Sequence, residues 1–594
     1  MRAGGQQSEI EQGALPGAPV PGGSSPQRPL KRSPALDLII AHGQIVDGTG
    51  RPSFEADILI EGDRIAAVAP GLADAAGAGP GRSGGPDRIE ARGRVVAPGF
   101  IDLHSHSDLC LTLPLDRQAA LLEGRVRQGI TTELMGNCGI GCVPVSGSTR
   151  ADVVRVCGFI TPDGVSWSWT SFASYLDHLE AQGPLLNVAS LAAHGPLRVL
   201  AMGPRGGRPA PDEMRALERL AGQVVDEGAF GISFGLIYPP GQFADTEELV
   251  KVARAAGRAG GFSAFHQRGS SRETLTQAVA ELLEVGRRAE VPVHHSHVET
   301  VGRRAWAGTP DILEAEETGR REGIDITADV IPYTAVCTTM LALYPPWSLD
   351  GGVVAFLERL KDRGTRARMK REVAETGASW PPWEGEGRFT MNIARECGWD
   401  HIRLAHVDGA ANKKHEHLTI AELGQRRGVD PFDALSDLLL EERGVATQLI
   451  FGISGDETTD DPLVPLLRSP RLALVTDAWE IGKGFPHPGA CGAFPRVLGH
   501  YVRERRLLSL EEAVRKMTSL PAGRLGLRDR GVVREGSKAD LVVFDPGAVR
   551  DRSTFTEPRR HAAGIDDVLI NGRRVVREGA FHPQPAGRVL RRGA

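Results

Sequence analysis

The chain has 594 residues, of which 41% are hydrophobic and 24% are charged, and its formal net charge is -5. This composition is typical of a soluble globular protein, and it argues against a nucleic-acid partner or an anionic membrane surface, because both favour a basic face. No apolar run reaches the roughly 18 residues that a membrane-spanning helix requires.

Residues 1–35 are rich in Gly, Pro, Ser and Gln and lack the apolar core of a signal peptide. We therefore predict a disordered tail on a cytoplasmic protein. The seven cysteines are scattered along the chain, and their odd number argues against a disulfide framework.

Short β-rich runs separated by Gly or Asp-Arg turns occupy residues 36–95, as in "DLIIAHGQIVDG". The same texture returns in residues 531–594, as in "DDVLINGRRVVREG". We predict that the two chain ends assemble into one small β-sandwich domain.

The middle of the chain, residues 96–530, alternates short apolar runs with helical patterns such as "DTEELVKVARAAGRAG". This rhythm is typical of a parallel sheet, and eight runs are the number that closes an α/β barrel. The runs are predicted to end near Leu103, Leu134, Ala193, Phe234, Phe265, Val298, Val330 and Asp477. We therefore predict a (β/α)8 TIM-like barrel.

A long insertion, from about residue 341 to about residue 464, precedes the last predicted strand. An insertion at the carboxyl end of a barrel strand lies on the face that carries barrel active sites. We interpret it as a lid or substrate-shaping subdomain, with a purely structural excursion as the alternative.

The first predicted barrel strand ends in "GFIDLHSHSD", which places His104 and His106 two residues apart. Residues i and i+2 of a strand point to the same face, so both imidazoles can converge on one ion. A polar cluster satisfied by hydrogen bonds at a strand end is the competing explanation.

Further potential metal ligands follow other predicted strands. They are Cys138 in "TTELMGNCGIG", His266 in "GFSAFHQRG", His297 in "VPVHHSHVE" and Asp477 in "LALVTDAW", and His295 is expected to share the face of His297. Core histidines rarely produce six potential ligands at strand ends, although a buried structural thiol is the alternative for Cys138. Nitrogen, thiolate and carboxylate ligands together favour Zn²⁺.

These motifs carry a family resemblance. "GFIDLHSHSD" resembles the His-x-His signature of the amidohydrolase superfamily. "MGNCG", "FHQR", "SHVE" and "FPRVLG" are similar to the D-aminoacylase (N-acyl-D-amino-acid deacylase) branch. The similarity runs from about Ala35 to the C-terminus and includes the insertion.

The resemblance implies one tightly bound zinc ion on Cys138, His266 and His297. It implies a second, weaker site formed by the other three potential ligands, with Cys138 as a bridge. It also implies that Asp477 carries a proton from the attacking water to the leaving nitrogen. Amide hydrolysis needs such a proton carrier, because an amide nitrogen leaves poorly unless it is protonated. The implied activity is zinc-dependent hydrolysis of a linear amide, either an N-acyl-D-amino acid or a related small N-acylated compound.

Several residues near the predicted strand ends are candidate substrate contacts. His194 ends the third strand, with a structural hydrogen bond as the alternative, and Tyr333 resembles a substrate-facing tyrosine of the family. The full set is Tyr333, Arg268, Glu299, His194 and His487.

The chain departs from the family pattern where a substrate α-carboxylate would be held, a task suited to Arg or Lys. The pattern leads us to expect basic residues where Glu299 and Gly489 stand. Candidate replacements are Arg268, Arg303, Lys483 and Arg496. A substrate that lacks the α-carboxylate, or that carries a positive group near Glu299, becomes plausible.

Two other functions compete with linear amide hydrolysis. The same fold could hydrolyse a cyclic imide or ureide, as in hydantoinase-type relatives, but a cysteine in place of their bridging lysine argues against it. The chain could also be a non-catalytic scaffold, although a scaffold has no need for all six ligands. The oligomeric state is not indicated by the sequence.

Overall fold

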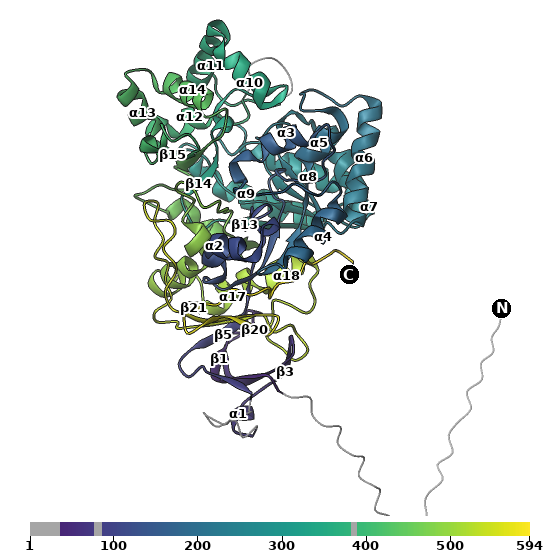
Figure 1. Cartoon of the computed structure of the whole chain (residues 1–594), viewed down its shortest axis with the longest axis vertical. Coiled ribbons are helices and arrows are strands. Elements are labelled where there is room, and N and C mark those ends of the chain that lie inside the picture. The colour runs from purple at the N-terminus through teal and green to yellow at the C-terminus, as the bar shows by residue number, and fades with distance from the viewer. Residues whose placement is uncertain (1–35, 76–85, 382–388, 594) are drawn as a thin grey trace, which may run out of the picture.

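The computed structural model describes residues 36–75, 86–381 and 389–593. The tail predicted at residues 1–35 lies outside the described residues. The molecule is elongated, with a β-sheet at one end, an α/β barrel in the middle and a mostly helical subdomain at the other end (Figure 1).

Strands from both ends of the chain form one nine-stranded sheet, in the order β21-β20-β19-β18-β5-β1-β2-β3, with β4 paired to β1. The two halves join where β18 lies antiparallel to β5, with Val542 opposite Ala97. The strands are β1 (Leu38–Ile45), β2 (Phe54–Glu61), β3 (Arg64–Ala69), β4 (Asp87–Glu90), β5 (Val95–Pro98), β18 (Leu541–Phe544), β19 (Ile565–Ile570), β20 (Arg573–Arg577) and β21 (Ala580–Phe581), with the short helix α1 (Leu72–Ala75) beside them. Since β5 leads directly into the first barrel strand, this sheet anchors the start of the barrel.

The barrel is built from parallel strands in two runs, β6-β7-β8 and β9-β10-β11-β12-β13-β17. Only Leu191 separates β8 from β9, so these two segments form one interrupted strand. The strands are β6 (Phe100–Asp102), β7 (Ile130–Met135), β8 (Asn187–Ser190), β9 (Ala192–Ala193), β10 (Gly231–Gly235), β11 (Phe262–His266), β12 (Val293–His295), β13 (Ile326–Val330) and β17 (Leu472–Leu474).

The first and last barrel strands meet just beyond their carboxyl ends. Ser105 and Ala478 form a parallel bridge, the Asp477 N–H donates to the His104 carbonyl oxygen at 2.9 Å, and the His106 N–H donates to the Ala478 carbonyl oxygen at 3.2 Å. With this contact the strands form a ring, which confirms the predicted α/β class.

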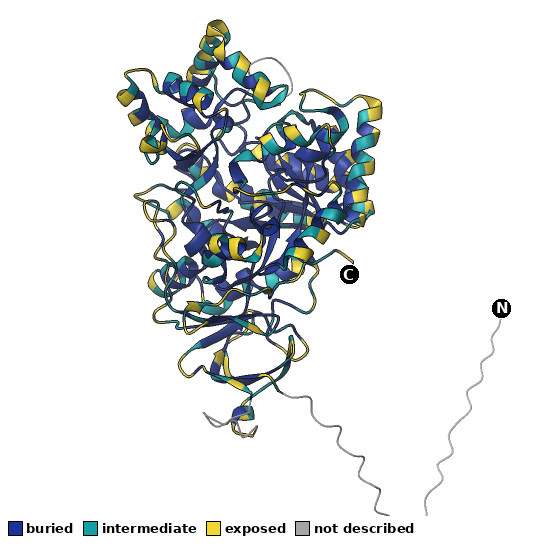
Figure 2. Ribbon diagram, viewed as in Figure 1, coloured by how far each residue is buried: buried dark blue, intermediate teal, exposed yellow. Residues whose placement is uncertain are grey.

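Helices surround the barrel strands, with buried faces toward the sheet and exposed faces toward solvent (Figure 2). In α7, for example, the Asp245 side chain caps the first turn by accepting from the Glu248 N–H at 2.9 Å, and Leu249, Val252 and Ala256 are buried. The helices of this part are α2 (Leu115–Val126), α3 (Arg150–Val156), α4 (Phe172–Gln182), α5 (His194–Met202), α6 (Pro211–Asp226), α7 (Thr246–Arg258), α8 (Leu275–Ala289), α9 (Thr309–Arg321), α15 (Val464–Arg468), α16 (Gly489–Arg496), α17 (Leu510–Met517) and α18 (Ser519–Leu525).

The insertion between β13 and β17 has its own three-stranded sheet, in the order β14-β16-β15, and its own apolar core around Phe356, Leu404 and Leu435. Its elements are β14 (Ala335–Thr339), α10 (Gly352–Lys361), α11 (Arg363–Glu375), α12 (Ile393–Cys397), β15 (Ile402–Val407), α13 (Ile420–Arg427), α14 (Pro431–Glu441) and β16 (Ala446–Phe451). The subdomain begins before residue 341, because β14 already belongs to its sheet. We refer to it below as the lid for its position only. A role in closing the site or shaping the substrate stays a prediction, with a purely structural excursion as the alternative.

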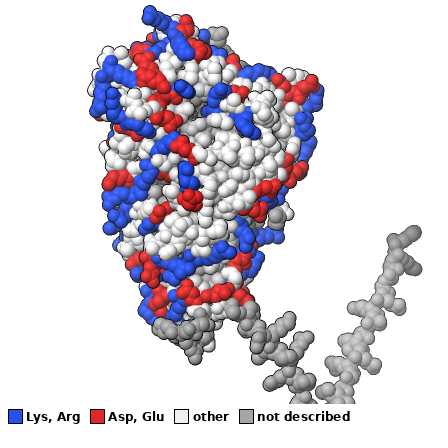
Figure 3. All heavy atoms as spheres, in the orientation of Figure 1, with Lys and Arg blue, Asp and Glu red and all other residues white. Residues whose placement is uncertain are grey.

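No helix of the described chain combines the length and the apolar character that crossing a membrane requires. On the face drawn in Figure 3, Lys and Arg side chains are interspersed with Asp and Glu. The cytoplasmic location and the lack of a nucleic-acid partner stay predictions.

Candidate metal centre

The six ligands predicted from the sequence come together at the carboxyl ends of the barrel strands. Their ligand atoms form two groups, each within 4.8 Å, that share one cysteine. One group is His104, His106, Cys138 and Asp477, and the other is Cys138, His266 and His297.

The side chains of both groups face one another at short distances. Cys138 Sγ lies 3.2 Å from His104 Nε2 and 3.4 Å from His297 Nε2. Asp477 Oδ1 lies 3.2 Å from His104 Nε2 and 3.3 Å from His106 Nε2. Cys138 therefore connects His104, which follows β6, with His297, which follows β12, while Asp477 contacts the two histidines that follow β6.

The donor set fits a zinc ion. Nitrogen, sulfur and oxygen atoms with lone pairs converge here. Burial raises the pKa of the Cys138 thiol to about 12, whereas coordination to a divalent cation deprotonates a thiol outright. Cysteine, histidine and carboxylate are the ligands that zinc takes in proteins.

Three of the ligand residues have an unusual backbone. Cys138, His297 and Asp477 have φ angles of 55°, 32° and 44°, a region that side-chain-bearing residues seldom occupy and that is associated with functional sites. The strands β12 and β17 consequently end at His295 and Leu474, three residues before the predicted ends, because His297 and Asp477 turn out of the extended conformation.

Asp329, at the end of β13, holds two of the ligand residues in place. Its Oδ2 lies 3.5 Å from His104 Nδ1 and 2.7 Å from His294 Nε2, and its Oδ1 accepts from the backbone N–H of His297. Although burial opposes ionisation, the charge of His104 and these hydrogen bonds hold the pKa of Asp329 well below its usual range. The sequence alone did not indicate this contact of Asp329 with the ligand residues.

We expect Asp329→Asn to weaken zinc affinity roughly 10- to 100-fold, because carboxylates that orient metal-binding histidines contribute about that much. Competition with a chelator measures the affinity. Glu316→Gln is the matched control: Glu316 Oε1 lies 2.8 Å from Nδ1 of His295, whose ring meets helix α9 rather than sharing the metal-facing side of His297. Equal zinc affinity in both variants would contradict an orienting role for Asp329.

A cavity with about 380 Å³ of empty space lies beside the metal ligands, between the barrel and the lid. Its lining residues are Ile237, Tyr238, His266, His297, Glu299, Val301, Val336, Cys337, Thr338, Met391, Ile393, Ile450, Ile453 and Asp477. The candidate metal ligands His266, His297 and Asp477 therefore border the cavity directly.

Of the five predicted substrate contacts, only Glu299 lines this cavity. His194 is fully buried and donates to Glu248 Oε1 at 2.9 Å, as the alternative of a structural hydrogen bond would have it. The Arg268 guanidinium pairs with Glu281 at 2.9 Å and donates to the carbonyl oxygen of Ala244, which directs it into the helix layer. The substrate contacts of His194 and Arg268 stay predictions, and neither residue lines this cavity.

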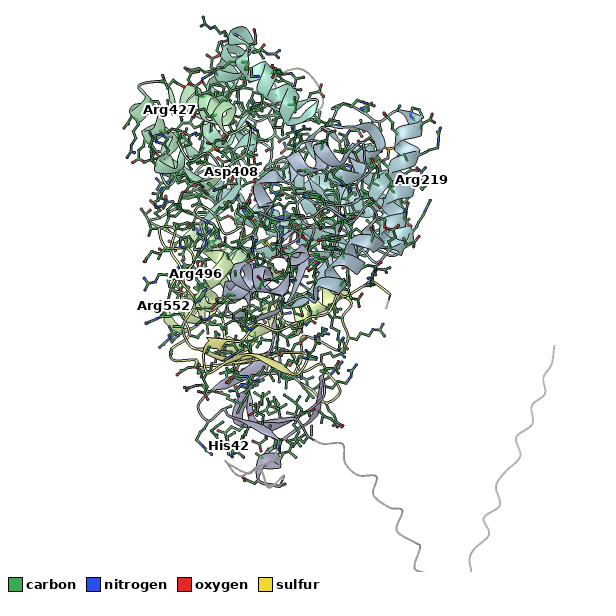
Figure 4. All side chains as sticks on the ribbon, in the orientation of Figure 1. His42, Arg219, Asp408, Arg427, Arg496 and Arg552 are labelled. Atoms are coloured by element: carbon green, nitrogen blue, oxygen red, sulfur yellow. The ribbon has the colours of Figure 1, made fainter. Side chains whose placement is uncertain are left out.

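Tyr333 and His487 belong to a separate aromatic cluster. Their ring centroids are 4.8 Å apart, and the His487 imidazole donates to the Ala335 carbonyl oxygen at 2.9 Å. The guanidinium of Arg496, labelled in Figure 4, lies 4.9 Å from the Tyr333 ring centroid and donates to the Pro332 carbonyl oxygen. Neither aromatic residue lines the cavity beside the metal ligands, and their contacts with a substrate stay predictions.

The other positions where a basic residue was considered contribute no cation to the cavity. Lys483 pairs with Asp163 at 2.9 Å and with Asp408, and Arg303 is exposed beside Trp306. Gly489, where the family pattern has arginine, is the first residue of α16. Among the described residues, the cavity lining therefore contains no Lys or Arg to replace a carboxylate-binding residue.

Sequence reasoning missed most of the cavity wall. Tyr238 donates to or accepts from Thr338 at 2.8 Å and packs against His266 with ring centroids 5.0 Å apart. Its position shortly after the end of β10 could have identified it in the sequence as a candidate for the cavity wall. Ile450 and Ile453 come from the lid, and in the sequence nothing separates them from ordinary core residues.

Glu299 stands out among the lining residues. It is 8% exposed, and burial together with the neighbouring charge of Asp477 raises its pKa to about 8. The backbone two residues earlier carries His297, so the carboxyl group lies on the segment that also supplies a metal ligand.

Comparison with known proteins finds relatives that align with nearly the whole chain. The model of the amidohydrolase family matches residues 87–576. The chain is 34% identical over 567 residues to a D-aminoacylase of Alcaligenes xylosoxydans xylosoxydans, an alignment covering 95% of this chain and 99% of the relative.

Solved structures agree with that alignment. The crystal structure of N-acyl-D-glutamate deacylase from Bordetella bronchiseptica, complexed with zinc and a phosphonate inhibitor that mimics the tetrahedral intermediate, gives a TM-score of 0.73 at 30% identity and covers 94% of this chain and 100% of that chain. L-hydantoinase from Arthrobacter aurescens gives a TM-score of 0.50 at 15% identity, with 94% and 100% covered, which is a likeness of fold alone.

Proposed function

Since this chain belongs to the amidohydrolase family and is a metal-dependent hydrolase of carbon–nitrogen bonds, we propose that it cleaves the linear amide of a small N-acylated amino compound with zinc as its metal. The observation that carries the proposal is the shared cysteine. Two groups of ligands meet at Cys138, and Asp477, a member of one group, lines the adjacent cavity.

The metal and Asp477 have separate roles in the proposed reaction. When bound, zinc lowers the pKa of water to about 7 and polarises the scissile carbonyl. Asp477 is the proton carrier: it accepts a proton from the attacking water and delivers it to the leaving nitrogen. The charge of His104 and a hydrogen bond from His106 hold the pKa of Asp477 well below its usual range despite burial, so its carboxylate is ready to accept a proton at neutral pH.

We propose that the tighter zinc site is the group of Cys138, His266 and His297, and that the group containing Asp477 is a second, weaker site. The first group supplies a thiol and two imidazoles, a common zinc donor set that leaves a coordination position open. Titration of metal-free protein with zinc, followed by metal analysis, would resolve one or two binding steps.

Of the two alternatives considered from the sequence, a cyclic substrate stays a candidate, whereas a scaffold without activity conflicts with membership of a family of metal-dependent hydrolases. Hydrolysis of a cyclic imide or ureide would use the same donor set, and the 15% identity to a hydantoinase supports only the fold. A non-catalytic scaffold is disfavoured because the six ligand side chains converge on one another in the described chain.

The proposal predicts that the zinc-loaded protein releases acetate from a panel of N-acetyl amino acids and their carboxamides, in D and L forms. A chelator should abolish the release, and added zinc should restore it. Turnover that persists after complete metal removal, or no turnover of any member by protein shown to hold zinc, would overturn the proposed function.

A further inference from the structure

The cavity beside the metal ligands is unusual in its charge. Apart from the metal-ligand set, the described residues of its lining include one ionisable carboxyl group, that of Glu299, and no Lys or Arg. The remaining wall is mostly aliphatic. The aliphatic lining residues are Ile237, Val301, Val336, Ile393, Ile450 and Ile453.

The carboxyl group of Glu299 is held in this wall without a partner from the chain. It is 8% exposed, and no side chain or backbone group of the described residues forms a hydrogen bond or ion pair with it. A polar side chain that lines a cavity without a protein partner can bond to whatever fills the cavity, so a ligand that donates a hydrogen bond can supply the missing contact.

Nearby cations do not reach Glu299. The Arg304 guanidinium pairs with Glu273 and lies 3.8 Å from Glu396, and it does not line the cavity. A substrate carboxylate placed beside Glu299 would therefore face the Asp477 carboxylate across the same cavity, with no Lys or Arg of the described lining to offset the repulsion, an arrangement that disfavours binding. An ammonium group or an amide N–H would instead satisfy the carboxyl oxygens.

We propose that Glu299 binds a cationic or N–H-donating group of the substrate, so that the preferred substrates are N-acylated amines and amino amides without a free α-carboxylate. This inference rests on the proposed function and names the substrate class of that same site. The aliphatic wall then contacts the hydrocarbon part of the substrate, and Asp477 and the metal ligands face its scissile amide.

The test compares three N-acetyl substrates that share the leucine skeleton in D and L forms. One keeps the carboxylate, one has a carboxamide in its place, and one has an aminomethyl group. Acetate release by the zinc-loaded protein gives kcat/KM for each. We expect the carboxamide and aminomethyl compounds to exceed the carboxylate roughly 10- to 100-fold, the range of a hydrogen bond to a charged group.

Variants then assign the preference to one side chain. Glu299→Gln should lower kcat/KM for the aminomethyl compound by a similar factor, and Glu299→Lys should make the carboxylate the preferred substrate. Glu396→Gln is the matched control, because Glu396 is a neighbouring lid carboxyl group that does not line the cavity, and it should leave the order of substrates unchanged.

The outcomes separate the inference from the proposed function. A wild-type protein that prefers the carboxylate overturns the inference while leaving amide hydrolysis intact, and this comparison requires no variant to fold. Absence of turnover of all three compounds, with zinc bound, overturns the proposed function itself. If the Glu299→Gln variant prefers the carboxamide and aminomethyl compounds over the carboxylate as strongly as the wild type does, the role of Glu299 is overturned.

Discussion

Replacing Asp477 by Asn is expected to lower kcat roughly 100- to 10,000-fold, the usual contribution of a positioned acid–base group. The side-chain amide of the introduced asparagine can neither accept the proton of the attacking water nor pass it to the leaving nitrogen of the substrate. Since Asp477 does not belong to the group of Cys138, His266 and His297, zinc bound to that group should stay in place.

Measurement of kcat together with zinc content separates the two effects of this substitution. Asp408→Asn serves as a control, since Asp408, labelled in Figure 4, is a lid carboxylate that pairs with Lys483 and does not line the cavity. We expect it to keep wild-type kcat. If Asp477→Asn kept its zinc and retained near-normal turnover, Asp477 would not be the proton carrier.

Cys138→Ser is expected to weaken both metal groups together and to abolish activity. A serine hydroxyl stays protonated where the thiolate is the ligand, and Cys138 is the one residue common to both groups of the described chain. Because even a residue that only orients a ligand contributes about 10- to 100-fold to affinity, loss of this ligand should cost more than about 100-fold.

The readout is zinc content after dialysis against a weak chelator, together with the sulfur-to-metal absorption band of the cobalt-substituted protein. Cys142→Ser is the matched control: Cys142 is also buried and lies on the same segment, but it belongs to neither group. It should keep zinc and the absorption band. A Cys138→Ser protein with full zinc content would refute the shared-ligand arrangement.

The ligand residues and the substrate contacts differed in how far they could be predicted. Each ligand follows a short apolar strand, and parallel strands bring their carboxyl ends to one rim, so sequence position alone implied proximity. Arg268 shows where this reasoning stops. Arg268 stands only two residues after the ligand His266, yet its side chain extends to Glu281 on α8. A buried guanidinium needs a carboxylate to neutralise its charge, and the position of that partner depends on the tertiary fold.

The sequence by itself determined the α/β class, the barrel rhythm and the six residues that converge, because strand periodicity and the residue type at a strand end are local properties. Only the tertiary structure decided which residues wall the cavity. Ile237 follows a barrel strand and Ile450 belongs to the lid, and their meeting depends on how the lid folds back over the barrel. The isolation of Glu299 was also decided there, because whether a carboxyl group finds a cation depends on every side chain that folding brings near it.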